Sequence, residues 1–145
     1  MLYGRYEHTI DAKNRVFVPA KYKESLGDSF KLAYNGINQC ILVYSNDEWD
    51  KFVVKINDVP EIEAGDFRRV LFSNTVDVQL DAQGRIVIPN YLKDVLKVSD
   101  DMLVKNLVIL GVGNHLEIWS AEGLAAKNNS LNMNDIKNLM IQLRI

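Results

Sequence analysis

The sequence contains two copies of one nine-residue pattern, set 70 positions apart (81 − 11 = 70). The copies read Asp11-Ala-Lys-Asn-Arg-Val-Phe-Val-Pro19 and Asp81-Ala-Gln-Gly-Arg-Ile-Val-Ile-Pro89. In each copy an acid and a turn precede an arginine, and a short run of β-branched or aromatic residues then ends at a proline. The alternation of that run indicates a strand, and Asn14 or Gly84 suits the turn in front of it. We therefore expect a fold built from two similar units.

The duplication extends beyond the motif, because the same offset pairs Leu26 with Leu96. A repeated unit of about half the chain predicts two small lobes that share a core. We place the first lobe, with a connector helix, at residues 1–58. The second lobe, at 59–145, begins with another connector helix and ends with an amphipathic helix.

The offset changes later in the copies. Tyr44-Ser45 corresponds to Trp119-Ser120, which lies 75 positions further on (119 − 44 = 75). We therefore expect about five residues to be inserted between the short helix and the hairpin of the second lobe, within residues 98–105.

Hydrophobic periodicity and turn residues predict an α+β fold. The expected strands are at residues 2–10, 16–18, 30–34, 40–44, 75–80, 86–88, 107–110 and 116–119. The expected helices are at residues 20–26, 46–57, 61–72, 90–96 and 135–144. The last helix carries Ile136, Leu139, Met140 and Leu143 on one face, so it needs an apolar surface on its own lobe or on a neighbouring molecule.

The formal net charge is −2, whereas nucleic-acid-binding domains are usually basic. The charges are unevenly distributed, however. The first 31 residues contain six Lys or Arg against four acidic residues, while residues 47–66 are mostly acidic. One face can therefore be positive on an acidic protein. Arg15 and Arg85, at equivalent turns, can reach phosphates or the edge of a guanine.

Neither an enzyme nor a bound cofactor is expected. Cys40 lies in an apolar run without a basic neighbour that would lower its pKa, and no glycine-rich phosphate loop precedes a Lys-Ser/Thr pair. His8 and His115 lack the spacing of metal ligands, so we expect no metal. No apolar run approaches the ~20 residues of a membrane span, and the N-terminus lacks an apolar signal core. We expect a cytoplasmic protein with no membrane partner and no small-molecule substrate.

A family resemblance rests on segments spread along the chain in order: Gly4-Arg-Tyr-Glu-His8, Asp11-x-Lys-x-Arg15, Pro19-Ala-Lys21, Asp81-x-Gln-Gly-Arg85, Pro89, Gly111-Val-Gly-Asn114 and Glu117-Ile-Trp-Ser120. Together they resemble the MraZ family over nearly the whole chain. The resemblance implies a tandem pair of AbrB-like swapped-hairpin β-barrel lobes, and protomers assembled into a homo-oligomeric ring. It also implies a cytoplasmic, nucleoid-associated transcriptional regulator. Its partner would be double-stranded DNA with short direct repeats upstream of the operon for cell division and cell-wall synthesis.

The candidate DNA-binding residues combine the family's signature positions with neighbouring lysines: Asp11, Lys13, Arg15, Lys21, Asp81 and Arg85. The aspartate of each copy can hold the fork of the arginine four residues later. Gln83 stands where the first copy has Lys13, so we expect the two lobes to contribute unequally.

Two alternatives stay open. An aspartate–arginine pair in a small β fold is often a structural salt bridge that pins a turn. Lys13, Lys21 and Lys23 taken singly are ordinary solvated lysines, whereas as a cluster beside Arg15 they can form a patch that contacts phosphates. The class of protein is open as well. The acidic net charge and the amphipathic final helix also suit an oligomeric protein-interaction or antitoxin-like module.

Overall fold

The computed structural model describes residues 1–145 and confirms the α+β class. The first part of the chain forms β1 (Leu2–Thr9), β2 (Arg15–Phe17), α1 (Ala20–Leu26), β3 (Ser29–Asn35), β4 (Cys40–Tyr44), α2 (Asn46–Asn57) and α3 (Glu61–Ser73). The second part forms β5 (Val76–Gln79), β6 (Arg85–Val87), α4 (Asn90–Lys93), the 3-10 helix η1 (Asp94–Leu96), β7 (Asn106–Gly113), β8 (Leu116–Ser120), α5 (Ala121–Asn129) and α6 (Met133–Gln142).

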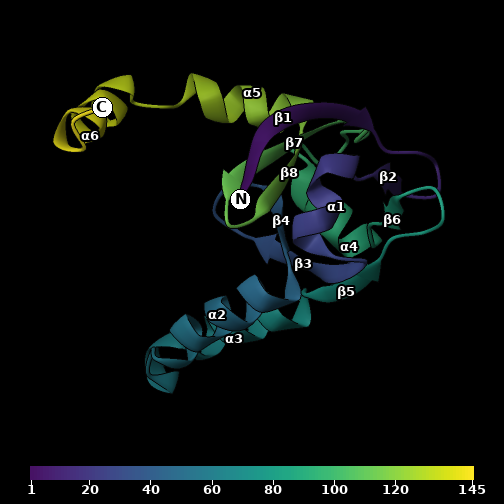
Figure 1. Cartoon of the computed structure of the whole chain (residues 1–145), viewed down its shortest axis with the longest axis horizontal. Coiled ribbons are helices and arrows are strands. Elements are labelled where there is room, and N and C mark those ends of the chain that lie inside the picture. The colour runs from purple at the N-terminus through teal and green to yellow at the C-terminus, as the bar shows by residue number, and fades with distance from the viewer.

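The strands form a six-stranded antiparallel sheet and a separate two-stranded ribbon. The order in the sheet is β1-β7-β8-β4-β3-β5, and the ribbon pairs β2 with β6 (Figure 1). The first strand of each copy therefore lies beside the hairpin of the other copy, because β1 pairs with β7 and β5 pairs with β3. The resemblance implied β-barrel lobes, but the sheet is open, with β1 and β5 as its edges, and no closed barrel forms.

A pseudo-twofold axis relates the two copies and passes through the β4–β8 and β2–β6 pairs. Leu42 is opposite Glu117, its counterpart at the offset of 75, and Val16 is opposite Ile86, its counterpart at the offset of 70. Both Val16 and Ile86 are buried. The central pairs thus put equivalent residues of the two copies side by side.

The strand register corrects the predicted insertion. The loop between α1 and β3 has two residues, 27–28, and the loop between η1 and β7 has nine, 97–105, a gain of seven (9 − 2 = 7). The β3–β4 turn has four residues, 36–39, and the β7–β8 turn has two, 114–115, a loss of two (4 − 2 = 2). The predicted five residues are the difference between these two changes (7 − 2 = 5). Sequence offsets reveal only that difference.

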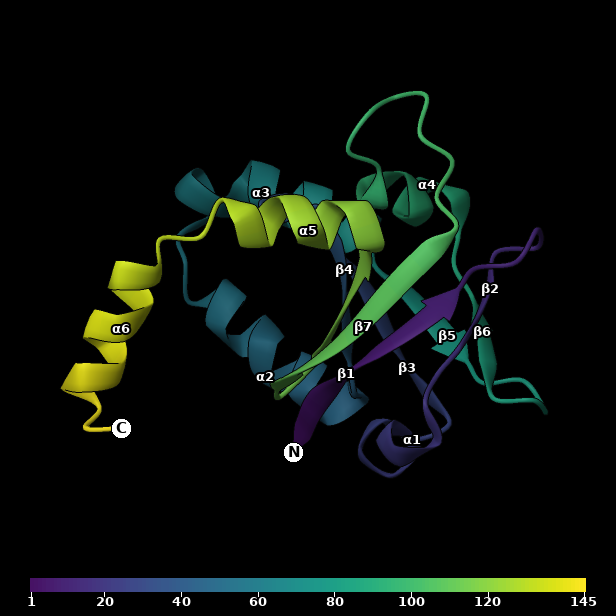
Figure 2. The same cartoon turned by 90° about the horizontal axis from the view of Figure 1, so that it is seen from above.

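Two apolar cores lie on the two faces of the six-stranded sheet. The larger core of 19 buried residues contains side chains from the sheet, from α1 and α4 and from the ribbon, and therefore belongs to both copies. The smaller core of 10 residues packs side chains of α2, α3 and α5 against the sheet. Figure 2 shows the ribbon and its turns at one end of the molecule, while α6 lies at the far end.

The helix boundaries follow from local capping. The hydroxyl oxygen of Ser45 accepts a hydrogen bond from the backbone N–H of Glu48 at 3.2 Å, and that of Ser120 accepts one from Gly123 at 2.9 Å. Each hydroxyl therefore satisfies an N–H that the first turn of a helix leaves without a partner. Sequence periodicity did not predict α5, because its apolar residues are few. The final helix was predicted, and none of its residues is buried. No helix of the protein is long and apolar enough to cross a membrane.

Candidate nucleic-acid interface

The first aspartate–arginine turn lies between β1 and β2. Oδ1 of Asp11 accepts hydrogen bonds from the backbone N–H groups of Lys13 at 2.9 Å and Arg15 at 2.8 Å. Oδ2 accepts a hydrogen bond from Nε of Arg15 at 2.6 Å. Asn14 adopts a left-handed conformation with φ of 59°, which asparagine tolerates better than most residues. One carboxylate therefore fixes both the backbone of the turn and the direction of the arginine.

The second turn, between β5 and β6, repeats this geometry. Oδ1 of Asp81 accepts from the backbone N–H groups of Gln83 at 2.9 Å and Arg85 at 2.8 Å, and Oδ2 accepts from Nε of Arg85 at 2.9 Å. One contact is added, because Nη2 of Arg85 donates to the Gln83 side-chain oxygen at 3.0 Å. The terminal nitrogens of Arg15 have no such partner. The two turns therefore share one frame, which is the set of three hydrogen bonds to the aspartate. They differ in which N–H donors of the arginine remain free.

Both aspartates are charged at neutral pH. The backbone N–H of Arg15 is the largest cause that holds the pKa of Asp11 below its usual value, and the Arg15 guanidinium adds to it. The N–H and guanidinium of Arg85 lower the pKa of Asp81 in the same way. Each carboxylate binds its arginine through Nε, which leaves the terminal NH₂ groups of Arg15 without a hydrogen bond, whereas one terminal nitrogen of Arg85 is held by Gln83.

The outer face of the ribbon carries both arginines. Arg15 is paired with Val87 and Phe17 with Arg85, while Val16 and Ile86 between them point into the core. Phe17 and Val87 are exposed, and Cζ of Arg85 lies 5.8 Å from the centre of the Phe17 ring. We did not predict Phe17 and Val87 as site residues. Strand alternation from the two arginines could have identified them.

Each turn also receives a lysine from the other copy. Nζ of Lys93 donates to the side-chain oxygen of Asn14 at 3.0 Å. Lys23 lies across Gly84, where an added Cβ would come within 2.8 Å of its Nζ. Lys23 was expected only in a cluster beside Arg15, and Lys93 was not predicted, although the 70-residue offset pairs the two lysines. Their placement against the opposite turn depends on the pairing of β2 with β6, which sequence spacing does not show.

The predicted site residues fall into three groups. Asp11, Lys13 and Arg15 share the first turn, and Asp81 and Arg85 share the second. Lys21 is placed elsewhere. Its Nζ lies 4.5 Å from the centre of the Tyr3 ring, beside β1, and no hydrogen bond joins it to either turn.

Other reactive side chains form no competing site. Burial raises the pKa of Cys40 to about 12, so its thiol is protonated at neutral pH. His115 stacks on Tyr44 with ring centres 4.7 Å apart, and burial lowers its pKa. No group of three or more His, Cys, Asp or Glu side chains lies in an arrangement that could hold a metal ion.

Comparisons with known proteins agree with the duplicated architecture. The family described as "MraZ protein, putative antitoxin-like" matches residues 1–69 and again residues 71–135. The "Transcriptional regulator MraZ" of Caldanaerobacter subterraneus subsp. tengcongensis is 41% identical over 124 residues, which cover 84% of this chain and 82% of the relative. The protein of the same name from Alkaliphilus metalliredigens is 38% identical over 149 aligned positions that span both chains completely. The chain belongs to the MraZ family.

Proposed function

We propose that this protein is a transcriptional regulator that binds double-stranded DNA through its two aspartate–arginine turns. Its relatives carry the name of transcriptional regulators, which supports the general class. The resemblance supports a finer proposal, in which the protein recognises short direct repeats upstream of the operon for cell division and cell-wall synthesis. Binding of that DNA would place the protein on the nucleoid.

One observation carries the proposal: both arginines lie on the outer face of one two-stranded ribbon. The major groove of B-DNA is about 12 Å wide and admits such a ribbon. A guanidinium can donate two hydrogen bonds to the edge of a guanine, and Arg15 has its terminal donors free. Lys13 on the first turn and Lys23 and Lys93 beside the turns would contact phosphates, and such contacts fix the register of a protein on DNA without reading its sequence.

Several protomers must act together, because each ribbon is small and the formal net charge of the chain is −2. In a homo-oligomeric ring, the ribbons of neighbouring protomers would meet successive direct repeats. Linking sites in this way can raise overall affinity by ~10²–10⁴ when the spacing matches. Each ribbon would therefore bind DNA weakly, and tight binding would come from several ribbons whose spacing matches that of the DNA repeats.

The direct test is binding of the full chain to a fluorescent duplex that carries the direct repeats upstream of its own gene, beside a scrambled duplex. We expect the repeats to be preferred. The logarithm of affinity should fall with the logarithm of salt concentration, with a slope of about −0.9 for each phosphate neutralised. The double variant Arg15→Ala, Arg85→Ala should lose the preference while keeping its circular dichroism spectrum.

A matched control is Arg5→Ala, because Arg5 is also an arginine bonded to a nearby carboxylate, that of Glu7, but lies on β1. Its DNA affinity should equal that of the wild type. If the double variant unfolds, or if it binds the repeats as well as the wild type, the aspartate–arginine pairs are structural and the proposal fails.

A second candidate function is an oligomeric protein-interaction or antitoxin-like module. The exposed apolar face of α6 favours it, since such a face needs a protein surface. A folded, oligomeric wild type that shows no preference for the repeats at low salt would select this second function.

A further inference from the structure

Helix α6 has an apolar face with nothing packed on it. Ile136, Leu139, Met140 and Leu143 follow the helical repeat, and Leu139 is 55% exposed. The helix is well capped, because Asn132 accepts a hydrogen bond from the backbone N–H of Asn134 at 3.0 Å. A structured helix with a continuous apolar stripe is built to pack against protein.

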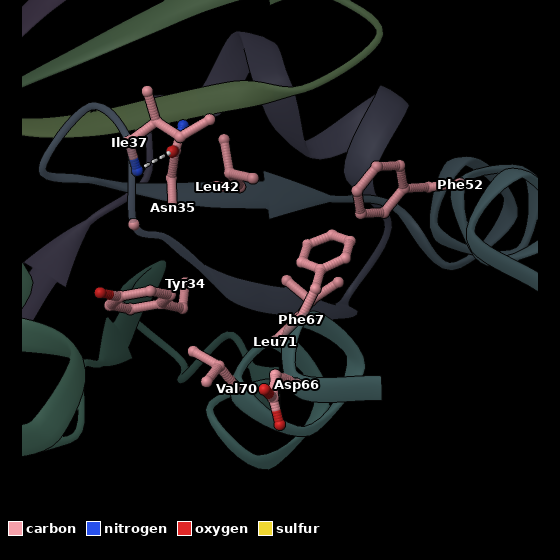
Figure 3. Close-up of a pocket in the computed structure, with 10 residues that line it drawn as sticks. Tyr34, Asn35, Ile37, Leu42, Phe52, Asp66, Phe67, Val70 and Leu71 are labelled. Atoms are coloured by element: carbon pink, nitrogen blue, oxygen red, sulfur yellow. Dashed lines mark hydrogen bonds between the residues drawn. The ribbon is translucent and has the colours of Figure 1, made fainter. Parts of the chain in front are cut away.

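An apolar groove of about 460 Å³ lies on the helical arm formed by α2 and α3. We call it the arm groove, and its walls include Tyr34, Ile37, Leu42, Phe52, Phe67 and Val70. Figure 3 shows these side chains around one hollow, with the β3–β4 turn on one side and α3 on the other. Ile37 is 90% exposed and Phe67 is 51% exposed, so the groove has apolar walls without a cover.

The charges of the two elements are complementary. Residues 46–73, which form the arm, contain seven acidic and four basic side chains, a net charge of −3. Residues 127–145, which include α6, contain three basic and one acidic side chain, a net charge of +2. Asp66 lines the groove with its side chain exposed, although Nη1 of Arg69 on the same helix already donates to one of its carboxylate oxygens at 2.6 Å, and Lys137 follows Ile136 at the edge of the apolar stripe of α6. Complementary charges of this kind orient two apolar surfaces and speed their association.

The pseudo-symmetry shows that α6 is the counterpart of α3. In each copy a helix after the hairpin is followed by three residues and a second helix: 58–60 separate α2 from α3, and 130–132 separate α5 from α6. Helix α3 folds back along α2 and buries Leu71, whereas α6 extends away from the body and buries nothing (Figure 1). Figures 1 and 2 together show α6 apart from α2 and α3 of its own chain.

We propose that α6 of one copy packs its apolar face into the arm groove of a second copy, with Lys137 beside Asp66. The inference rests on the self-association in the proposed function and names the surfaces that produce it. The donor helix and the acceptor groove are different surfaces, so the contact is head-to-tail. Such a contact closes into a ring when its rotation allows closure, and it forms an open chain when it does not.

Mixing two variants tests this geometry. Leu139→Asp disables the donor helix, and Phe67→Asp disables the acceptor groove. Each variant alone should sediment as a monomer, in contrast to the oligomeric wild type. An equimolar mixture should give a dimer and nothing larger, because one intact helix meets one intact groove and the remaining surfaces are disabled.

Matched controls use exposed apolar residues that lie on the same helices but outside the proposed contact. Ile141 lies off the apolar face of α6, and Ile62 is on α3 but does not line the groove. Ile141→Asp and Ile62→Asp should therefore sediment like the wild type. Wild-type oligomers in either single variant, or monomers in the mixture, overturn the proposal. Because no α6 residue is buried within its own chain, Leu139→Asp should leave the circular dichroism spectrum of the protein unchanged.

A cross-link distinguishes a second copy from the chain's own groove. Cys40 is buried, so Asp66→Cys with Lys137→Cys introduces the two accessible thiols. Mild oxidation should give a ladder of covalent multimers that disappears on dilution before oxidation. A fast-migrating monomer, independent of dilution, would place α6 in its own groove and overturn the proposal. None of these assays contains DNA, so their failure is separate from a failure of DNA binding at the ribbon.

Discussion

The two aspartate–arginine turns have the same frame and different outer contacts. Each carboxylate accepts two backbone N–H groups and one Nε, with distances that agree within 0.3 Å. In the second turn Gln83 accepts a hydrogen bond from Arg85, whereas Lys13 leaves Arg15 free and adds a positive charge. Duplication has therefore preserved the aspartate that holds the arginine, while the residue two positions after it, Lys13 or Gln83, has changed.

The largest expected difference is in DNA affinity after loss of one arginine. A good bidentate contact to a base is worth about 1–3 kcal/mol of discrimination. Arg15→Ala should lower affinity for the direct repeats by roughly 10- to 100-fold, because a free guanidinium is lost. Arg85→Ala should lower it less, because Gln83 already holds one of the terminal nitrogens. Fluorescence anisotropy at one fixed salt concentration measures both, and equal losses would show that Gln83 releases Arg85 on DNA.

The backbone conformations of the two turns can also be compared, by the effect of substitutions on the stability of the fold. Gly84 has φ of 79° and Asn14 has φ of 59°. Gly84→Ala should destabilise the fold by about 1–2 kcal/mol, since an alanine in this left-handed conformation brings its Cβ close to backbone oxygen. Gly84→Asn, which copies the first turn, should cost less. Urea unfolding measures both variants, and an Asn variant as unstable as the Ala variant would show that crowding by Lys23, rather than φ, limits this position.

The two turns can be compared further by exchanging Lys13 and Gln83, the residues that differ between them. Gln83→Lys should release Nη2 of Arg85 and add one charge near the phosphates. The slope of log affinity against log salt should then steepen by about 0.9 per ribbon if the new lysine neutralises one phosphate. Lys13→Gln should make the slope shallower by the same amount. An unchanged slope in both variants would place these side chains outside the DNA contact.

Much of this architecture could be predicted from the sequence because local rules determine it. The helix from residue 20 to 26 and both hairpins follow from turn residues, a proline and periodicity, and the structure confirms them. The boundary between lobes at residues 58 and 59 stays a prediction, although the main core mixes both copies. Helix α5 was missed because apolar residues do not recur strongly along it.

Contacts between the copies could not be predicted, because they depend on strand pairing over long sequence separations. Nothing local shows that β1 pairs with β7, or that Lys93 reaches the turn of Asn14. The ribbon shows the same limit. The sequence located both arginines, but their shared face follows only from the pairing of Arg15 with Val87 and of Phe17 with Arg85.

The smallest expected effect concerns the aspartates, for which the two turns should behave alike. The same causes, in the same order, hold the pKa of Asp11 and the pKa of Asp81 below the ordinary value of about 3.9. A depressed carboxyl pKa contributes stability that is present above that ordinary value and is lost as pH falls through the folded pKa. Both turns should therefore weaken only in acid below about pH 4 and stay intact at neutral pH.

An NMR titration of the carboxyl carbons can separate the causes of this depression. Arg15→Ala removes the Nε contact but keeps the backbone N–H of residue 15, which is the largest cause. The pKa of Asp11 should rise in this variant and still remain below about 3.9, and Arg85→Ala should do the same for Asp81. A full return to the ordinary value at either position would mean that the arginine side chain, and not the backbone, sets the charge of that turn. It would also show that the two frames are less alike than their distances indicate.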